Sequence, residues 1–266
     1  MSSDKIKVDE ETRKQGDACL VSLSTCPTSP EEASRGVPSL VWRAGQERRY
    51  EMVRRWAELA GKRVLDVGCG VGMYTSAFLR AGSLVVGVEV EHKRAMEARE
   101  RANGIARAVG ESLPFSEAAF DIIFSHEVLE HVVDDRASVA EMVRAVKPGG
   151  RILIFVPNRL YPFETHGIFW RGKYRFGNIP LVNWLPAALR DRLAPHVRAY
   201  TTGGLCRLFD GLPVRFIHHT VIFPGYDNIV ARVPVLGRLL RGVTYALERT
   251  PLKAFGLSHL LVAEKT

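Results

Sequence analysis

The sequence predicts an α/β fold, a mostly parallel sheet covered by helices on both faces, and two observations lead to this prediction. Apolar runs typical of buried strands alternate with helical patterns between Arg63 and Val156. The first run, V-L-D-V, ends in the turn G-C-G-V-G, after which the pattern becomes helical. Such alternation is typical of βαβ units. A chain of 266 residues can form one such domain with additional segments.

The expected elements begin after a polar leader. Residues 1–37 are rich in Ser, Thr, Glu and Pro and are expected to be disordered. Ser39 can cap a helix that runs to about Leu59, because apolar residues recur there at helical spacing. Lys147-Pro-Gly-Gly is expected to form a turn into the fifth strand. The expected strands are Arg63–Val67, Leu84–Glu89, Ala106–Val109, Phe120–Ser125 and Arg151–Val156, and the expected helices between them are Met73–Ala81, His92–Asn103 and Ala137–Val146.

The strand–helix rhythm breaks after Pro157. A helix at Thr202–Phe209 and two further strands, Val214–Ile222 and His259–Glu264, complete the expected elements. The remaining segments read as insertions, at about 158–200 and 223–256. Residues 38–266 are therefore expected to form a single domain with two insertions.

The net charge of +8 is unevenly distributed. From Arg151 onward the chain has 16 Lys and Arg against 6 Asp and Glu. This is either a solvated basic surface or a surface for an anionic partner: a phosphorylated substrate, a membrane or nucleic acid. No apolar run approaches the roughly 18 residues of a membrane span, and no signal peptide is apparent. The expected location is therefore the cytoplasm, with peripheral contact to a membrane left open.

The glycine turn predicts the ligand by elimination. A P-loop needs a basic residue after its glycines, and none occurs before Arg80. The dinucleotide fingerprint begins correctly at Gly68 and Gly70, but its third position is Met73. Asp66, two residues before the turn, would oppose a pyrophosphate but would suit an ammonium group. S-adenosylmethionine is such a ligand, because it carries a sulfonium and an α-amino group and no phosphate.

Three further segments reach the edge at which such a ligand would bind. Glu89 ends the second strand, 19 residues after Gly70, where a carboxylate can hold both ribose hydroxyls. Glu111 follows the third strand, where adenine would lie. Ser125 and His126 end the fourth strand. In open α/β sheets ligands bind outside the carboxyl ends of the strands, which is where these segments arrive.

Together these motifs resemble class I S-adenosylmethionine-dependent methyltransferases, the broad group that includes ubiquinone- and menaquinone-pathway enzymes. The matching segments are V-L-D-V-G-C-G-V-G, V-V-G-V-E, G-E-S-L-P-F, F-D-I-I-F-S-H-E-V-L-E-H-V and V-K-P-G-G-R-I-L-I, between Gly61 and Pro157. The resemblance implies a Rossmann-like seven-stranded sheet with an antiparallel last strand, S-adenosylmethionine as cofactor, and a methyltransferase domain over 38–266 whose insertions cap the site. Val109 stands where relatives often carry an Asp, so Glu111 is the expected polar partner of adenine.

Two histidines are the candidate catalytic residues. His126 would lie near the reacting methyl group, where it could act as a general base; a histidine satisfied by backbone at a strand end is the other interpretation. Glu164 and His166 follow the fifth strand on the same side of the sheet. A base is needed only for a poorly acidic nucleophile, since much of the catalysis of methyl transfer is orientation and desolvation.

Glu127-Val-Leu-Glu130-His131 is a possible metal motif. In ubiquinone O-methyltransferases and small-RNA 2′-O-methyltransferases, E-x-x-E-H carries a magnesium, and Glu164 or His166 could complete its shell here. In many relatives the same residues only begin a helix. We therefore expect no metal.

The favoured function is methyl transfer from S-adenosylmethionine to an O, N or C acceptor on a small-molecule, lipid or glycan substrate. An RNA methyltransferase using the basic C-terminal surface is the alternative. No appended RNA-binding domain and no N-P-P-Y motif is found, so no nucleic-acid partner is expected. A nicotinamide-dependent oxidoreductase is disfavoured by Met73 and Asp66. Interleaved aromatic and basic residues suit an amphipathic or anionic acceptor: Phe163, Phe169, Trp170, Arg171, Lys173, Tyr174, Arg175, Phe176 and Trp184.

An amphipathic helix is expected in the second insertion. Pro234 can start it and Thr250-Pro251 can stop it. Its apolar stripe is Val235, Leu236, Leu239, Leu240, Val243 and Leu247, flanked by Arg238, Arg241 and Arg249. The favoured interpretation is a cap helix that packs this stripe onto the core. The other is a helix lying on an anionic bilayer.

Overall fold

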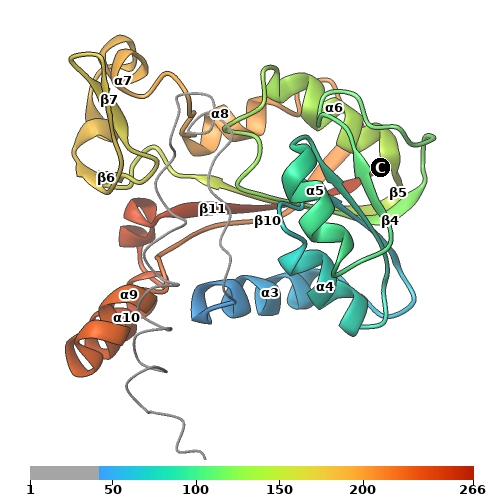
Figure 1. The fold of residues 1–266 in the computed structure, drawn as a ribbon, viewed down its shortest axis with the longest axis horizontal. Coiled ribbons are helices and arrows are strands. Elements are labelled where there is room, and N and C mark those ends of the chain that lie inside the picture. The colour runs from blue at the N-terminus through green and yellow to red at the C-terminus, as the bar shows by residue number, and fades with distance from the viewer. Residues whose placement is uncertain (1–41) are drawn as a thin grey trace, which may run out of the picture.

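The computed structural model describes residues 42–266, so the expected leader and the Ser39 cap lie outside the described residues. Its main element is a seven-stranded sheet in the order β10-β11-β5-β4-β1-β2-β3 (Figure 1). β11 runs antiparallel to both of its neighbours, β10 and β5, and the pairs on the other side of β5 are parallel. This confirms the Rossmann-like, seven-stranded fold class.

The strands of the main sheet are β1 (Arg63–Val67), β2 (Leu84–Glu89), β3 (Ile105–Arg107), β4 (Phe120–His126), β5 (Val146–Pro157), β10 (Val214–Ile222) and β11 (Ser258–Lys265). The helices are α3 (Ala44–Trp56), α4 (Met73–Arg80), α5 (His92–Arg99), α6 (Asp135–Ala145), α7 (Ala187–Leu193), α8 (Thr202–Arg207), α9 (Asp227–Arg232) and α10 (Pro234–Leu247). The first insertion adds β6 (Phe163–Glu164), β7 (Ile168–Trp170), β8 (Lys173–Arg175), β9 (Ile179–Pro180) and the 3-10 turn η1 (Val182–Trp184), and the second adds η2 (Pro251–Phe255).

Helices cover both faces of the sheet because its central strands are apolar on both sides. On one face, α3 and α4 bury Val53 and Phe78 against Phe124 of β4. On the other, α6 and α8 bury Met142 and Leu205 against the alternate residues of the same strands. Each face of the sheet thus has its own core.

Several expected boundaries were wrong for local reasons. α3 begins at Ala44 and ends at Trp56, because the extended backbone at Ala57 turns the chain toward β1. β3 stops at Arg107, and Val109 leaves the sheet to form a bridge with Ser112.

The expected turn at Lys147–Gly150 is instead the bulged start of β5. Val146 pairs with Phe120 and Arg151 pairs with Ile122, so the four residues between them lie opposite Asp121 alone. Lys147 Nζ donates to Asp121 Oδ1 at 2.6 Å across the bulge. The turn residues therefore serve to start the strand pairing and not to precede it.

The first insertion leaves the sheet at the end of β5, and the second leaves it at the end of β10 (Figure 1). Among residues 42–266, no helix combines the length and the apolarity that crossing a bilayer requires.

Candidate functional site

The glycine turn after β1 depends on two close approaches. Gly68 has φ +71°, and a Cβ there would lie 2.3 Å from Cγ2 of Val128. Gly72 has φ +81°, and its Cβ would lie 3.2 Å from Cα of Ala98 in α5. Gly72 therefore allows the helix packing that the dinucleotide fingerprint assigns to its third glycine, where this chain has Met73.

A cavity of about 500 Å³ opens over this turn, at the carboxyl ends of β1, β2 and β4. This volume is in the range of small-molecule sites. Its lining includes nearly all the expected site residues: Asp66, Gly68, Gly70, Glu89, Glu111, His126 and His166, together with Glu127 and His131.

Ser125, expected to contact the cofactor, does not line the cavity. Phe124 and His126 line it from one face of β4, and alternation along a strand directs Ser125 to the other face. Ser125 is fully buried there, and its hydroxyl has no hydrogen-bond partner among the described residues. Ser125 thus lies at the end of the strand that the sequence indicates, with a side chain that does not line the cavity.

Asp66 and Glu89 are buried carboxylates on the floor of the cavity. The Thr75 hydroxyl donates to Asp66 Oδ2 at 2.6 Å, but burial outweighs this bond and raises the pKa of Asp66 to about 7. The Glu89 oxygens accept from the backbone N–H groups of Gly70 and Glu91, both at 2.9 Å. Each Glu89 oxygen keeps a further lone pair for a ligand hydroxyl.

Glu111 lies at the rim of the cavity and also braces a loop. Its Oε1 accepts from the backbone N–H groups of Val133 and Asp134, at 2.7 and 3.3 Å. These bonds fix the carboxylate beside the expected adenine position.

His126 is poorly suited to be a general base. Burial lowers its pKa well below the ordinary value, so the ring is neutral at physiological pH and binds a proton weakly. The ring packs against Tyr74 and Phe155, with centroids 5.1 and 5.6 Å away. These contacts indicate that His126 shapes the wall of the cavity.

His166 is oriented by a buried ion pair that the sequence did not predict. Its Nδ1 lies 3.1 Å from Glu164 Oε1, and its backbone N–H donates to the same oxygen at 3.0 Å. Arg190 of α7 donates to the other oxygen, Oε2, at 2.9 Å and to the carbonyl of Val197 at 2.6 Å. Burial opposes the charge of Glu164, but His166 and Arg190 outweigh it and lower the pKa of Glu164 to about 2.

An ionised Glu164 accepts a hydrogen bond from Nδ1–H of His166. In this tautomer the lone pair of Nε2 is available. His166 lines the cavity, and Nε2 lies 3.8 Å from Glu127 Oε2. The structure thus brings together the Glu164–His166 cluster that the sequence placed after the fifth strand. Arg190, buried in the first insertion, has no sequence signal beyond a basic residue on a short helix.

Glu130, His131 and His166 form a set of possible metal ligands, one atom of each lying within 4.8 Å of the others. Burial and the charge of Glu127 raise the pKa of Glu130 well above its usual range. Neither Glu130 oxygen has a hydrogen-bond partner among residues 42–266. A carboxylate and two imidazoles suit a divalent cation, so the residues present would fit one.

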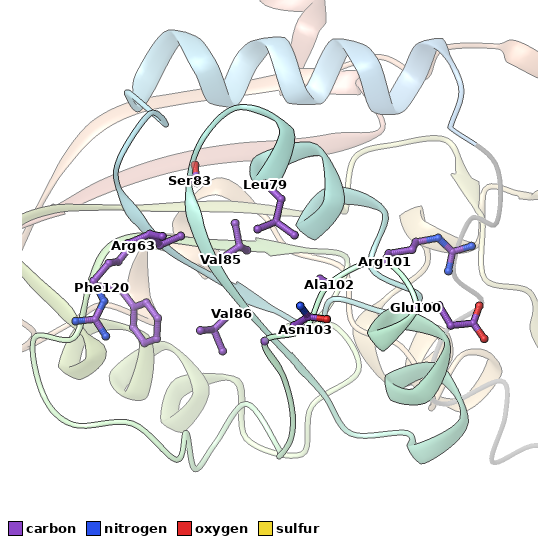
Figure 2. Close-up of a pocket in the computed structure, with 12 residues that line it drawn as sticks. Arg63, Leu79, Ser83, Val85, Val86, Glu100, Arg101, Ala102, Asn103 and Phe120 are labelled. Carbon is purple, nitrogen blue, oxygen red and sulfur yellow. The ribbon is translucent and has the colours of Figure 1, made fainter.

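A second cavity, of about 530 Å³, lies at the opposite edge of the sheet, near the starts of β1 and β2. Figure 2 shows its labelled side chains, Arg63, Asn103 and Phe120 among them, spread around it. It contains none of the expected site residues, and open α/β sheets bind ligands at the other edge.

Comparison with known proteins identifies the central part of the chain. A family model described as a methyltransferase domain matches residues 65–154. An uncharacterised methyltransferase of Mycobacterium sp. is 40% identical over 108 residues, which cover 40% of this chain and 43% of the relative. A ubiquinone biosynthesis O-methyltransferase of Aromatoleum aromaticum is 34% identical over 126 residues, 42% of this chain and 50% of the relative.

This chain thus spans about half the length of these curated relatives. Solved structures match more of it. An S-adenosylmethionine-dependent methyltransferase from Mesorhizobium loti is 20% identical, with a TM-score of 0.56 over 81% of this chain and 96% of its own. The [4+2]-cyclase SpnF is 17% identical, with a TM-score of 0.55 over 84% of this chain and 83% of its own. These likenesses confirm the fold, and the cyclase shows that function must be argued from the site.

Asp66→Asn tests how the buried carboxyl group of Asp66 affects the free energy of unfolding. The folded protein holds the Asp66 proton more tightly than the unfolded chain between pH 3.8 and about 7. The free energy of unfolding contributed by Asp66 should therefore fall as the pH rises through this window, by on the order of 4 kcal/mol, and stay low above it. Urea unfolding at pH 5 and pH 8 should show a smaller loss in Asp66→Asn than in the wild type. An identical loss in both would contradict the prediction, and Glu51→Gln, at an exposed site, serves as the control.

Proposed function

We propose that this chain transfers a methyl group from S-adenosylmethionine to an O, N or C acceptor on a small-molecule, lipid or glycan substrate. The observation that carries the proposal is the cavity over the glycine turn, which has two buried carboxylates, Asp66 and Glu89, on its floor. Buried carboxylates oppose a phosphate and favour a ligand with a cationic end and a ribose. The match of residues 65–154 to a methyltransferase domain supports the same cofactor.

Each part of the cofactor would meet a different element. Gly68 and Gly70 give it backbone contact, Asp66 faces its ammonium group, Glu89 holds the ribose hydroxyls and Glu111 lies beside the adenine. When bound, S-adenosylmethionine supplies an electrophilic methyl group on a sulfonium sulfur. The residues of the chain then have to orient the acceptor, exclude water and remove a proton where the acceptor is weakly acidic.

His166 is the proposed general base. Its Nε2 lone pair is directed by the Glu164–Nδ1 contact, and the proton it accepts would be stabilised by the charge of Glu164. Arg190 keeps Glu164 ionised and fixed, so the first insertion contributes directly to the geometry of the site. An acceptor hydroxyl makes good use of such a base, since it is a weak nucleophile until its proton is removed.

Glu89→Ala should weaken S-adenosylmethionine binding by about 1.5–3 kcal/mol, because charge-assisted hydrogen bonds to the ribose are lost. Calorimetry measures this, with NADH as the competing ligand class. Glu100→Ala removes an exposed acid and should leave affinity unchanged. Unchanged affinity in a folded Glu89→Ala variant would overturn the role of Glu89, and tight NADH binding by the wild type would overturn the cofactor.

His166→Ala should lower kcat by about 10²–10⁴-fold, the usual contribution of a general base, with little change in affinity for S-adenosylmethionine. His218→Ala removes a histidine that stacks on Trp56 outside the cavity and is the matched control. An unchanged kcat in a folded His166→Ala variant would show that this residue is not the base.

Activity should survive dialysis against excess EDTA, because the proposal uses Nε2 of His166 for a proton and not for a cation. The measurement is methyl transfer before and after chelation, together with calorimetric titration of Mg²⁺. Loss of activity that Mg²⁺ restores, with Mg²⁺ binding abolished in Glu130→Gln, would instead assign Glu130, His131 and His166 as metal ligands.

A further inference from the structure

The apolar face of α10 is turned outward, contrary to the expectation that it packs onto the core. Val235, Leu236, Leu239 and Val243 are 76%, 57%, 63% and 51% exposed. The only buried residues of the helix are Gly237 and Thr244.

The reason lies in how α10 meets α9. A Cβ at Gly237 would lie 2.6 Å from the backbone of Val230, so the helices touch through the smallest residue of α10. This close packing turns the small-residue side of α10 inward and the bulky side outward. Ile229 and Val233, 39% and 49% exposed, extend the exposed apolar surface onto the α9 side.

We call this surface the outer face, which consists of Ile229, Val233, Val235, Leu236, Leu239 and Val243. In Figure 1, α9 and α10 extend away from the body of the protein, on the side opposite α5 and α6. Large exposed apolar patches on soluble proteins mark interaction sites for proteins or membranes.

Charge around the outer face is positive because the acids of this insertion are already paired. Asp227 binds Arg241 at 2.9 Å, and Glu248 binds Arg48 of α3. Four exposed cations of this insertion remain: Arg232, Arg238, Arg249 and Lys253. Within residues 42–266, no carboxylate lies within 4.0 Å of the charged nitrogens of these four side chains.

We propose that the outer face docks the protein on an anionic lipid bilayer, with α10 lying along the interface. The apolar residues would enter the boundary of the acyl chains, and the four cations would meet the headgroups. A second copy suits the surface less well, because a two-fold dimer through it would bring both sets of cations together.

The docked surface is joined to the methyltransferase cavity through α3. The backbone N–H of Gly45 donates to Asp227 Oδ2 at 3.1 Å, and the next residue, Gln46, lines the cavity. Docking would therefore hold the cavity close to the bilayer, within reach of an acceptor carried by the membrane. The docking itself does not depend on methyl transfer.

Vesicle flotation of the full chain tests the proposal, with phosphatidylcholine vesicles that contain or lack phosphatidylglycerol. The wild type should float with the anionic vesicles at low salt, should release them as salt rises, and should not float with the neutral ones. Each cation near such a surface strengthens binding about fivefold, so Arg238→Glu/Arg249→Glu should weaken it at least about 25-fold. Arg241 is unsuitable for this test because it pairs with Asp227.

Leu236→Ser/Leu239→Ser should also abolish flotation while the thermal unfolding midpoint stays unchanged, since both side chains are exposed. The matched controls are Arg80→Glu/Lys93→Glu for charge and Leu84→Ser for an exposed leucine at the opposite edge of the sheet. Each control should float like the wild type. A wild type that stays in the soluble fraction at low salt, or that binds neutral vesicles equally, would overturn the proposal. So would a dimer that sedimentation shows to dissociate in Leu236→Ser/Leu239→Ser.

Discussion

The loop that follows β4 packs closely against the glycine turn that follows β1. This contact constrains the position of both loops at the carboxyl edge of the sheet. Val128 occupies the space that a side chain on Gly68 would need. Glu127, immediately before Val128, has φ +57°, a strained conformation for a residue with a Cβ. This contact holds the loop that carries Glu127 and Glu130 against the cofactor side of the cavity. One packing contact thus joins the groups proposed to bind the cofactor to those proposed to face the acceptor.

The buried carboxylates of the site fall into two electrostatic settings. Glu164 stays charged because Arg190 and His166 flank it, and its pKa is low. Among residues 42–266, no arginine or lysine forms an ion pair with Asp66 or Glu130, and burial raises the pKa values of both carboxyl groups. Uncompensated acids in a cavity cost free energy that a positively charged ligand recovers. The site is therefore prepared for positive charge, in agreement with a sulfonium cofactor that also carries an ammonium group.

Local sequence patterns predicted the sheet well, since β1, β2 and β10 have the expected bounds, and the glycine turn located the cavity. The errors came from properties that a one-dimensional pattern does not contain. The sequence indicated the edge of the sheet that Ser125 reaches, but not that the alternation of β4 directs its side chain away from the cavity. Arg190 could not be found, because its partner Glu164 lies 26 residues away in the chain. The expected orientation of α10 was wrong, because periodicity identifies an apolar stripe but not the surface that the stripe faces.

The way in which the second insertion is attached has a consequence for how such proteins diversify. Ile222, the last residue of β10, pairs with Ser258, the first of β11, and the N–H of Leu257 donates to the carbonyl of Ile222 at 2.7 Å. The chain therefore leaves β10 and enters β11 at two residues that are paired neighbours in the sheet. Whatever is inserted there can be lengthened, shortened or exchanged without shifting the strand register.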